Sequence, residues 1–352
     1  MQAGLFGATC DKNLSGERME RIEPGPGSLR ADPPSYSFAR KRSCDVDEHA
    51  ACLSAWNQTY EQLTPGPFEG NLVEALFDGV QLFRETTNQV VHELGAGRAG
   101  AYMFGVPVST GGAGYHGGRP IRDDSVIVLR DRQDLDFRAP PQLDLIAVSM
   151  PIDALGRYAR DIERRDIDAE LRGVAVVSPL RERVERFRSL LLMALESVCA
   201  NPDKLRHPAM RKALGQELCG AVLDVLGGHE AQRSCPEGPT RGHAIVCRAQ
   251  EYMRAHVEDP LTVEDLCREL GVSRRTLQYS FREVLRVNPV SYLRALRLNG
   301  VRRALKAGTE RNGGAIQDVA ARWGFWHLSH FACDYRRMFG ELPSETVSRA
   351  CS

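Results

Sequence analysis

The chain has 352 residues, and its 46 Lys and Arg residues balance its 46 Asp and Glu residues, so that the formal net charge is zero. Hydrophobic residues make up 42% and charged residues 26%, a composition typical of globular proteins that excludes a wholly disordered or collagen-like chain. No run approaches the roughly 18 apolar residues that a membrane-spanning helix needs. The length predicts two domains. A neutral total argues against a nucleic-acid partner, but it conceals how charge is distributed along the chain.

The ten cysteines are scattered, and no C-x-x-C pair occurs. Irregularly spaced cysteines, in a chain without an apolar signal core near Met1, predict free thiols in a reducing cytoplasm. The sequence spacing of zinc ligands is missing, so we expect no metal site. The H-x-H pair of cupin-type metal enzymes and the G-x-S-x-G motif of hydrolases are also absent, so we expect no catalytic residues. An enzyme fused to a DNA-binding domain is the remote alternative.

Residues 1–47 are expected to form a disordered tail, because Pro and Gly are frequent and no amphipathic period is present. A folded effector-sensing domain is expected over residues 48–226. Its first element, residues 49–63, is expected to be a helix. Short β-prone runs then alternate with turn residues, which predicts an antiparallel sandwich or a barrel such as a cupin-like one. These runs cover residues 72–77, 80–83, 90–94, 101–108, 125–130, 134–137 and 143–150.

Two helical patterns follow, over residues 180–199 and 207–226, and each carries an apolar stripe at helical spacing. They are expected to form an antiparallel hairpin. Two interpretations stay open, since this hairpin could pack against the β region or form a homodimer interface. Residues 227–242 read GGHEAQRSCPEGPTRG, a composition that predicts a linker.

The last 110 residues contain an internal repeat. The first copy, residues 263–285, reads VEDLCRELGVSRRTLQYSFREVL, and the second, residues 316–339, reads IQDVAARWGFWHLSHFACDYRRMF. In both copies apolar residues occupy positions i, i+3, i+4 and i+7 before a glycine, Gly271 or Gly324, and a second apolar stripe follows. Two helices around a short Gly-containing turn form a helix-turn-helix. We therefore expect an α+β protein, whose all-α C-terminal domain over residues 243–352 has two such units joined by a helix.

The charge is divided unequally between the expected domains. Residues 243–352 contain 17 Lys and Arg against 12 Asp and Glu, whereas the rest of the chain contains 29 against 34. Residues 273–306 carry nine basic residues and one acidic residue. A solvent-exposed surface usually carries charges of both signs, so this excess of positive charge predicts a surface that contacts phosphate groups. The phosphate-contacting candidates are Arg274, Arg282, Arg286, Arg297, Arg302 and Arg303.

The outward face of the second helix in each copy is the candidate base-reading surface. Arg pairs with guanine and Gln with adenine in the major groove, so Arg275 and Gln278 are the strongest candidates. The second copy presents smaller and mostly uncharged side chains, which favours contact with thymine methyl groups or weaker readout. Local signals agree with this register, since Thr262 and Asp265 fit a capping box and Ser273 is placed to cap the reading helix.

Residues 245–348, and above all the stretch GFWHLSHFACDYRRMFGELPSE, resemble the AraC/XylS family of bacterial transcription regulators. The resemblance implies two reading helices about 34 Å apart in successive major-groove segments. Cys333 departs from the family pattern, in which a polar or basic residue is common. Carried over by position, the base-reading residues are Arg275, Gln278, Tyr279, Leu328, Ser329 and His330.

Shorter matches narrow the resemblance to members that regulate ethanolamine-utilisation operons. They are RLNGVRRAL, WGFWHLSHFA and, in the N-terminal region, W-x-Q-x-Y-x-Q-L-x-P-G-x-F-x-G followed by QLFRET. This likeness implies an activator that works with RNA polymerase on double-stranded promoter DNA and responds to ethanolamine and adenosylcobalamin. The alternative is a regulator of another catabolic operon with a different effector. The effector-binding residues are not predicted.

Overall fold

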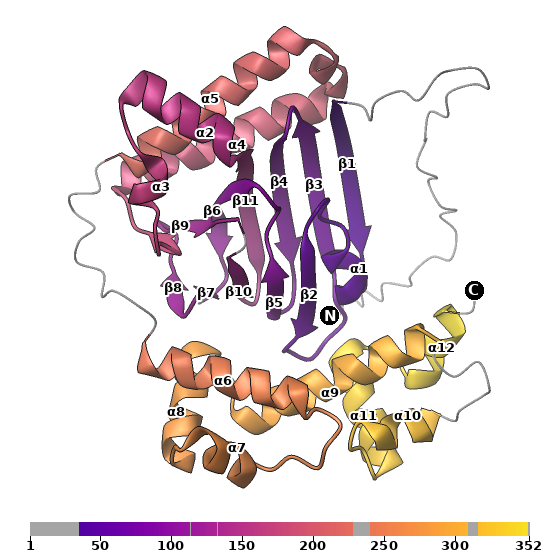
Figure 1. Cartoon of the computed structure of the whole chain (residues 1–352). Coiled ribbons are helices and arrows are strands. Elements are labelled where there is room, and N and C mark those ends of the chain that lie inside the picture. Colours follow the sequence, from indigo (N-terminus) through magenta and orange to yellow (C-terminus); the bar gives the residue numbers. More distant parts are fainter. Residues whose placement is uncertain (1–34, 113, 132, 228–239, 309–315, 351–352) are drawn as a thin grey trace, which may run out of the picture. The chain divides into compact units, whose positions relative to one another are not determined.

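The computed structural model describes residues 35–112, 114–131, 133–227, 240–308 and 316–350 (Figure 1). Strands occupy the N-terminal part, and the described residues from Arg181 onward form helices. The α+β class expected from the sequence is confirmed. Most of the expected tail, residues 1–34, and most of the expected linker, residues 228–239, lie outside the described residues.

The N-terminal part forms two antiparallel sheets. The seven-stranded sheet has the order β1-β3-β4-β11-β6-β9-β12, and the five-stranded sheet the order β2-β5-β10-β7-β8. The hairpin of β3 and β4 turns at Asp78 and Gly79, both with positive φ, the backbone that a two-residue Asp-Gly turn requires. The strands are β1 (Tyr36–Ser43), β2 (Asn57–Gln62), β3 (Gly70–Phe77), β4 (Val80–Thr87), β5 (Val91–Ala96), β6 (Ala101–Thr110), β7 (Gly114–His116), β8 (Arg119–Ile121), β9 (Val126–Leu129), β10 (Asp134–Arg138), β11 (Leu143–Pro151) and β12 (Val176–Val177).

Side chains from both sheets interleave to form one core, which contains Phe83 and Ala147 from the larger sheet and Val91 and Phe137 from the smaller one. The arrangement is therefore a sandwich, one of the two that the strand spacing allows. All seven β-prone runs predicted from the sequence are strands. Five strands, β1, β2, β7, β8 and β12, are not among those runs.

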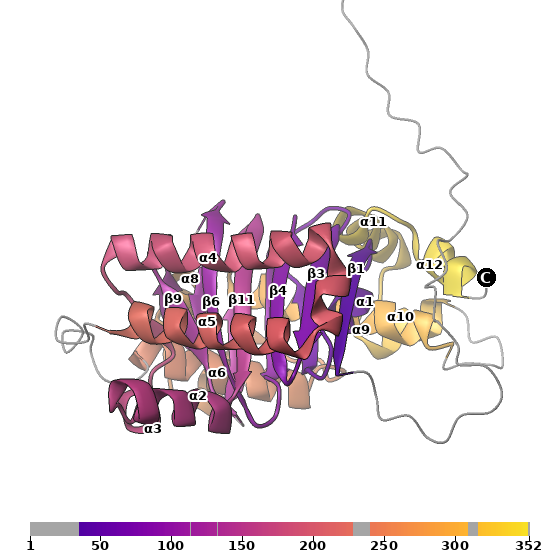
Figure 2. The ribbon, with the colours of Figure 1, turned by 90° about the horizontal axis from the view of Figure 1, so that it is seen from above.

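Helices cover the outer face of the seven-stranded sheet, where α4 and α5 lie side by side across the strands (Figure 2). Helix α4 buries five side chains in the core that it shares with this sheet, namely Val184, Phe187, Leu191, Leu195 and Val198. Burial of each such side chain stabilises the fold by about 1.5–3 kcal/mol. The hairpin thus packs on the β region. The helical segments here are α2 (Ile152–Tyr158), the π-helical turn Ala159–Glu163, α3 (Ile167–Glu170), α4 (Arg181–Ala200), the 3-10 turn Pro202–Arg206 and α5 (Pro208–Leu226).

Two expectations about the start of the folded region are wrong. The segment Tyr36–Ser43, expected to belong to the tail, is strand β1 and pairs with β3 along its whole length. The helix expected over residues 49–63 is instead a short helix α1 (Val46–Ala50) followed by strand β2. Ala55 has φ +63°, a left-handed conformation that ends any helix, and β2 then pairs with β5.

Helix α1 is held to the sheets by a buried histidine. Asp45 caps the helix by accepting hydrogen bonds from the backbone N–H groups of Asp47 and Glu48. His49 Nδ1 lies 2.8 Å from Ser43 Oγ, and its Nε2 lies 3.0 Å from Glu85 Oε1. Burial by itself would lower the pKa of His49, but its interactions with Cys52 and Glu85 raise it from 6.5 to about 9.

The raised pKa of His49 predicts a pH-dependent stability. The folded state holds this proton more tightly than the unfolded state, so the contribution is fully present below about pH 6.5 and is lost as pH rises through 9. We expect the free energy of unfolding of the wild type to fall by roughly 1–3 kcal/mol more than that of His49→Gln between these limits. Urea unfolding at stepped pH measures this difference. Parallel pH profiles of the two proteins would contradict the prediction.

The described residues of the C-terminal part form seven helices around a second core, to which Leu277, Phe281, Tyr292, Phe331 and Tyr335 contribute fully buried side chains. Among the described residues no helix is long and apolar enough to cross a membrane. The first helix begins at Arg241, inside the expected linker, where Thr240 caps it. The helices are α6 (Arg241–Ala255), α7 (Val263–Leu270), α8 (Arg274–Val284), α9 (Pro289–Lys306), α10 (Ile316–Arg322), α11 (Leu328–Phe339) and α12 (Pro343–Ala350).

Candidate DNA-binding interface

Helices α7 and α8 form the first helix-turn-helix unit, with the boundaries that the repeat predicts. The capping box at Thr262 is formed in both directions, because Thr262 accepts from the N–H of Asp265 and Asp265 accepts from the N–H of Thr262. Gly271 ends α7 with φ +64°, a conformation that favours glycine. Ser273 then caps α8 by accepting from the N–H of Thr276. The turn is therefore specified by local sequence.

Helix α8 buries one face and exposes the other. Leu277 and Phe281 are fully buried in the C-terminal core. On the opposite face Arg275 is exposed, Tyr279 is 67% exposed and Gln278 is half-buried. A helix that presents such side chains to solvent from its first turns can enter a major groove without disturbing its own packing.

Helices α10 and α11 form the second unit, and α9 holds it in place. A Cβ atom on Gly300 of α9 would lie 2.1 Å from the ring of Trp323, so only glycine allows α10 to approach this closely. Gly324 follows with φ +80° and opens the turn toward α11. The second unit thus repeats the first, with one additional residue between the glycine and the second helix. Trp323 is half-buried and packs against the C-terminal core.

The outward face of α11 differs in chemistry from that of α8. Leu328 is 44% exposed, Ser329 and His330 are exposed, and Trp326 in the preceding turn is 75% exposed. Cys333 is also exposed, one turn further along the helix. These side chains offer apolar contact and single hydrogen bonds rather than the paired donors of arginine.

The six arginines expected to contact phosphate occupy different environments. Arg274 and Arg282 are exposed on α8. Arg286 is exposed but donates two hydrogen bonds, of 3.1 and 2.7 Å, to the Tyr115 hydroxyl on β7. Arg297 is half-buried and donates to the carbonyl oxygens of Val257 and Asp259, at 3.0 and 2.6 Å. Of these four arginines, only Arg274 and Arg282 are exposed and make none of the hydrogen bonds just described.

Arg302 and Arg303 face the N-terminal part rather than solvent, which differs from the expectation of a phosphate-contacting row. Arg302 is 6% exposed and lies 2.8 Å from both Asp45 Oδ2 and Glu341 Oε1. Arg303 pairs with Asp47 and Glu61 at 3.1 and 2.6 Å. The physical reason is that the buried carboxylates around α1 need cations, and α9 supplies them. The basic surface available to DNA is therefore narrower than the sequence suggests.

A small cavity lies between the two sheets and carries two acidic side chains. Its volume is about 20 Å³, and Tyr60, Phe83, Glu85, Glu93 and Met103 are among the lining residues. Glu85 Oε1 accepts a hydrogen bond from Tyr60 Oη at 3.0 Å, whereas Glu93 Oε1 is buried without a hydrogen-bond partner. Burial, and then the neighbouring charge of Glu85, raise the pKa of Glu93 well above its usual value. Glu85 Oε1 also lies 3.0 Å from His49 Nε2, so Glu93 is the acid of this cavity whose charged form a bound cation would stabilise.

This cavity was not predicted, although the sequence contains a signal for it. Glu85 lies two residues after the buried Phe83 in β4, and Glu93 lies two residues after the buried Val91 in β5. A glutamate in phase with buried apolar residues of a strand points toward the core. Strand phase alone would therefore have indicated both acids.

Comparison with known proteins relates mainly the C-terminal part to transcription regulators. A family model described as "Helix-turn-helix domain" matches residues 266–349. The "Probable thc operon regulatory protein" of Rhodococcus erythropolis is 32% identical over 158 residues, which cover 45% of this chain and 47% of that protein. The "XylDLEGF operon transcriptional activator 2" of Pseudomonas putida is 34% identical over 127 residues, which cover 36% of this chain and 78% of that protein.

A solved structure, described as a "probable AraC family transcriptional regulator" from Rhodopseudomonas palustris, is 34% identical. The match covers 30% of this chain and 97% of that chain, with a TM-score of 0.29. The chain spans less than half of the length of its relatives from Rhodococcus erythropolis, Ralstonia nicotianae and Pseudomonas aeruginosa.

Proposed function

Since this chain belongs to the AraC/XylS family of transcription regulators, we propose that it binds promoter DNA through both helix-turn-helix units and regulates transcription in response to a small molecule. The observation that carries this proposal is the exposure of polar and aromatic side chains on the second helix of each unit, α8 and α11, while α9 contacts both units. The proposed location is the cytoplasm, where promoter DNA lies.

The proposed base-reading residues are Arg275, Gln278 and Tyr279 on α8, and Leu328, Ser329 and His330 on α11. All six are exposed or half-buried. Arg275 and Gln278 can each make a bidentate contact with one base, whereas Leu328 is suited to a thymine methyl group. Arg274 and Arg282 are proposed to contact phosphates and position the helix. Arg302 and Arg303 are left out because they are engaged with acidic residues of the N-terminal part.

Selection of binding sites from random double-stranded DNA by the full chain tests this function. We expect an enriched site with two conserved blocks about 10 base pairs apart, corresponding to successive major-groove segments on one face of the duplex. Hydroxyl-radical footprinting on that site should protect both blocks. Failure to enrich any sequence from the random pool would contradict a sequence-specific regulator.

We further propose that the effector carries an ammonium group and binds in the cavity between the sheets. A cation there would pair with Glu93, whose Oε1 atom is buried without a hydrogen-bond partner, whereas Glu85 already contacts Tyr60 and His49. Ethanolamine has this chemistry. The cavity holds about one water molecule, so flexible side chains such as Met103 must move to admit even four heavy atoms. Adenosylcobalamin is many times larger than this cavity, which argues against it as the occupant.

A thermal-shift comparison of ethanolamine with ethylene glycol tests the ligand class. The two molecules have similar sizes, but only ethanolamine is charged at neutral pH. We expect ethanolamine to raise the melting temperature of the wild type and to have at least tenfold lower affinity for Glu93→Gln, which keeps the shape of the neutral acid. Equal shifts with both ligands, or an unchanged response of Glu93→Gln, would exclude recognition of the charge. A different catabolic effector then becomes the better proposal.

The hairpin of α4 and α5 is proposed to mediate dimerisation as well as to cover the sheet. A groove of about 300 Å³ opens between these helices, and Met193 and Met210 beside it are 62% and 43% exposed. Exposed methionines of this kind are common at protein interfaces. Contact with RNA polymerase and the activating sign of regulation are proposed from the family resemblance.

A further inference from the structure

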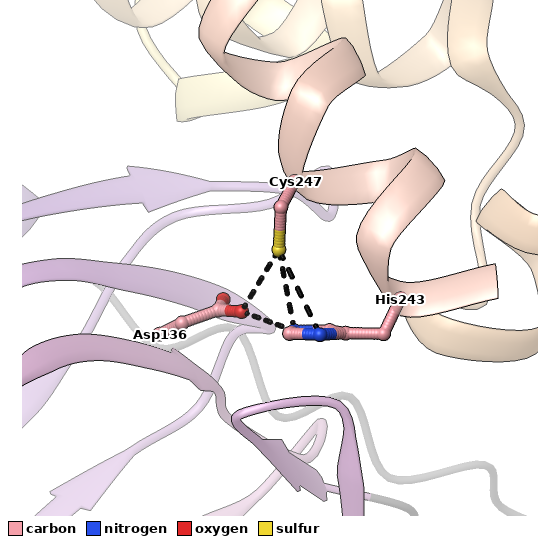
Figure 3. Close-up of side chains that lie close together, drawn as sticks. All are labelled: Asp136, His243 and Cys247. Carbon is pink, nitrogen blue, oxygen red and sulfur yellow. Dashed lines mark hydrogen bonds and ion pairs between the residues drawn. The ribbon is translucent and has the colours of Figure 1, made fainter. Parts of the chain in front are cut away.

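Three side chains with metal-binding atoms meet between strand β10 and helix α6 (Figure 3). Asp136 projects from β10, while His243 and Cys247 lie one turn apart on the same face of α6. His243 Nε2 lies 2.9 Å from Asp136 Oδ2 and 3.3 Å from Cys247 Sγ, and that sulfur lies 3.9 Å from Asp136 Oδ2. Asp136 and Cys247 are half-buried, and His243 is buried, at 9% exposed.

These distances approach those between the ligands of a tetrahedral zinc ion. With bonds of about 2.3 Å to sulfur and about 2.0–2.1 Å to nitrogen or oxygen, the ligand atoms lie roughly 3.3–3.6 Å apart. The observed separations bracket this range, so shifts of a few tenths of an ångström would suffice. Thiolate, imidazole and carboxylate together favour Zn²⁺ over Mg²⁺ or Ca²⁺, which prefer oxygen ligands alone.

We propose that Asp136, His243 and Cys247 bind one Zn²⁺ ion that joins the β sandwich to the first helix of the DNA-binding part. Binding replaces the proton of the Cys247 thiol and any proton on His243 Nε2, and both protons leave to solvent. Three protein ligands leave the fourth tetrahedral position to water or another small ligand.

A second layer of contacts holds Asp136 in position for this role. His92 is fully buried, and its Nε2 lies 2.7 Å from Asp136 Oδ1, the carboxylate oxygen that does not face His243. Its Nδ1 lies 3.1 Å from the hydroxyl of Tyr292, which also accepts a hydrogen bond from Arg254 at 3.0 Å. Outer contacts of this kind orient the ligands in metal sites. His92 is therefore assigned as a positioning residue.

The location of the site would couple the proposed effector cavity to a reading helix. Leu135 and Phe137, on either side of Asp136, line the cavity between the sheets. On the other side α6 packs against α8. An ion bound here would fix the spacing between β10 and α6. The binding of Zn²⁺ itself does not depend on the proposed regulatory function.

The same three side chains also satisfy one another without a metal, through an ion pair between His243 and Asp136 and a thiol contact. Cobalt binding separates these two possibilities, because Co²⁺ occupies zinc sites and a bound thiolate adds a charge-transfer band in the near ultraviolet. The full chain is stripped with a chelator under reducing conditions and titrated with Co²⁺. We expect one equivalent to bind with this band, and Zn²⁺ to displace it.

Variants locate the ion. Cys247→Ser should abolish the thiolate band and lower the Co²⁺ affinity at least tenfold, and Asp136→Asn should lower the affinity similarly while the thiol remains. Cys267→Ser is the matched control, since Cys267 is also a half-buried cysteine on a C-terminal helix and should leave the spectrum unchanged. His92→Gln should lower the affinity roughly 10–100-fold and keep the band.

The proposal is overturned if no Co²⁺ or Zn²⁺ binds at one equivalent, or if the thiolate band survives Cys247→Ser. Loss of the band in Cys267→Ser alone would also overturn it, by moving the site elsewhere. Far-ultraviolet circular dichroism of each variant checks folding. Because Asp136→Asn preserves both volume and thiol, it keeps the test decisive even if Cys247→Ser does not fold.

Discussion

An Arg302→Ala variant of the full chain is expected to lose roughly 3–5 kcal/mol of its free energy of unfolding. Arg302 lies between Asp45 and Glu341, and each of the three side chains is at most 8% exposed. Removing the guanidinium would leave two carboxylates buried with reduced compensation, and their desolvation would no longer be offset. Urea unfolding followed by circular dichroism measures the loss.

Arg337→Ala is the matched control for this experiment. Arg337 pairs with Asp334 at 3.1 Å, but its side chain is 69% exposed. An exposed pair of this kind contributes about 0–1 kcal/mol, so the control should unfold almost as the wild type does. If Arg302→Ala were no less stable than Arg337→Ala, the buried ion pairs would not exist in solution.

The salt dependence of DNA binding by Arg302→Ala tests the phosphate role separately. Each phosphate contact contributes about 0.9 to the slope of log K against log salt concentration. We expect the slope to be unchanged, because Asp45 and Glu341 engage the guanidinium. A slope reduced by about one would mean that Arg302 leaves these carboxylates and contacts DNA in the complex.

The tandem helix-turn-helix could be predicted because its specification is local. Leu266 and Leu270 mark one helix and Leu277 and Phe281 the next, while Gly271 separates them, all within 16 residues. Spacing and capping residues of this kind report on backbone conformation without reference to the rest of the chain. The same reasoning located seven strands, whose ends are marked by turn residues.

The missed strands lack such clear signals. Strand β1 lies at the edge of its sheet and carries the run Arg40-Lys41-Arg42. Edge strands tolerate charged residues, whereas central strands exclude them. The apolar residues before and within β2 happen to fall at helical spacing. Only the left-handed Ala55 and the pairing with β5 decide between helix and strand there. Neither is visible in the periodicity.

The burial of Arg302 on α9 could have been predicted from the spacing of apolar residues along that helix, but its partner could not. Leu298, Val301, Arg302 and Leu305 fall at i, i+3, i+4 and i+7, which places Arg302 on the buried face of the helix. Its partner Asp45 is 257 residues away, so no local pattern indicates the pair. Asp136 is likewise remote from His243 and Cys247, by 107 and 111 residues, which explains why ligand spacing in the sequence did not indicate their cluster.

The double variant Arg275→Ala/Gln278→Ala is expected to lose roughly 2–6 kcal/mol of binding free energy on the selected DNA site, because each residue contributes about 1–3 kcal/mol as a bidentate base contact. Both side chains are on the outward face of α8, whereas its core residues Leu277 and Phe281 are untouched, so the fold should be retained. Fluorescence anisotropy on the selected site and on a scrambled duplex measures the loss. Binding to the scrambled duplex should change much less.

Arg282→Ala provides the opposite pattern and so identifies which contacts carry sequence information. Arg282 is exposed on the same helix, and a phosphate contact made by it would weaken binding to both duplexes and lower the salt slope by about 0.9. Leu328→Ala on α11 should reduce affinity for the selected site less than Arg275→Ala does, because a methyl contact is weaker than a bidentate hydrogen bond. If the double variant on α8 protects the same site with wild-type affinity, α8 is not the reading helix, and specificity must come from α11 or from the shape of the DNA.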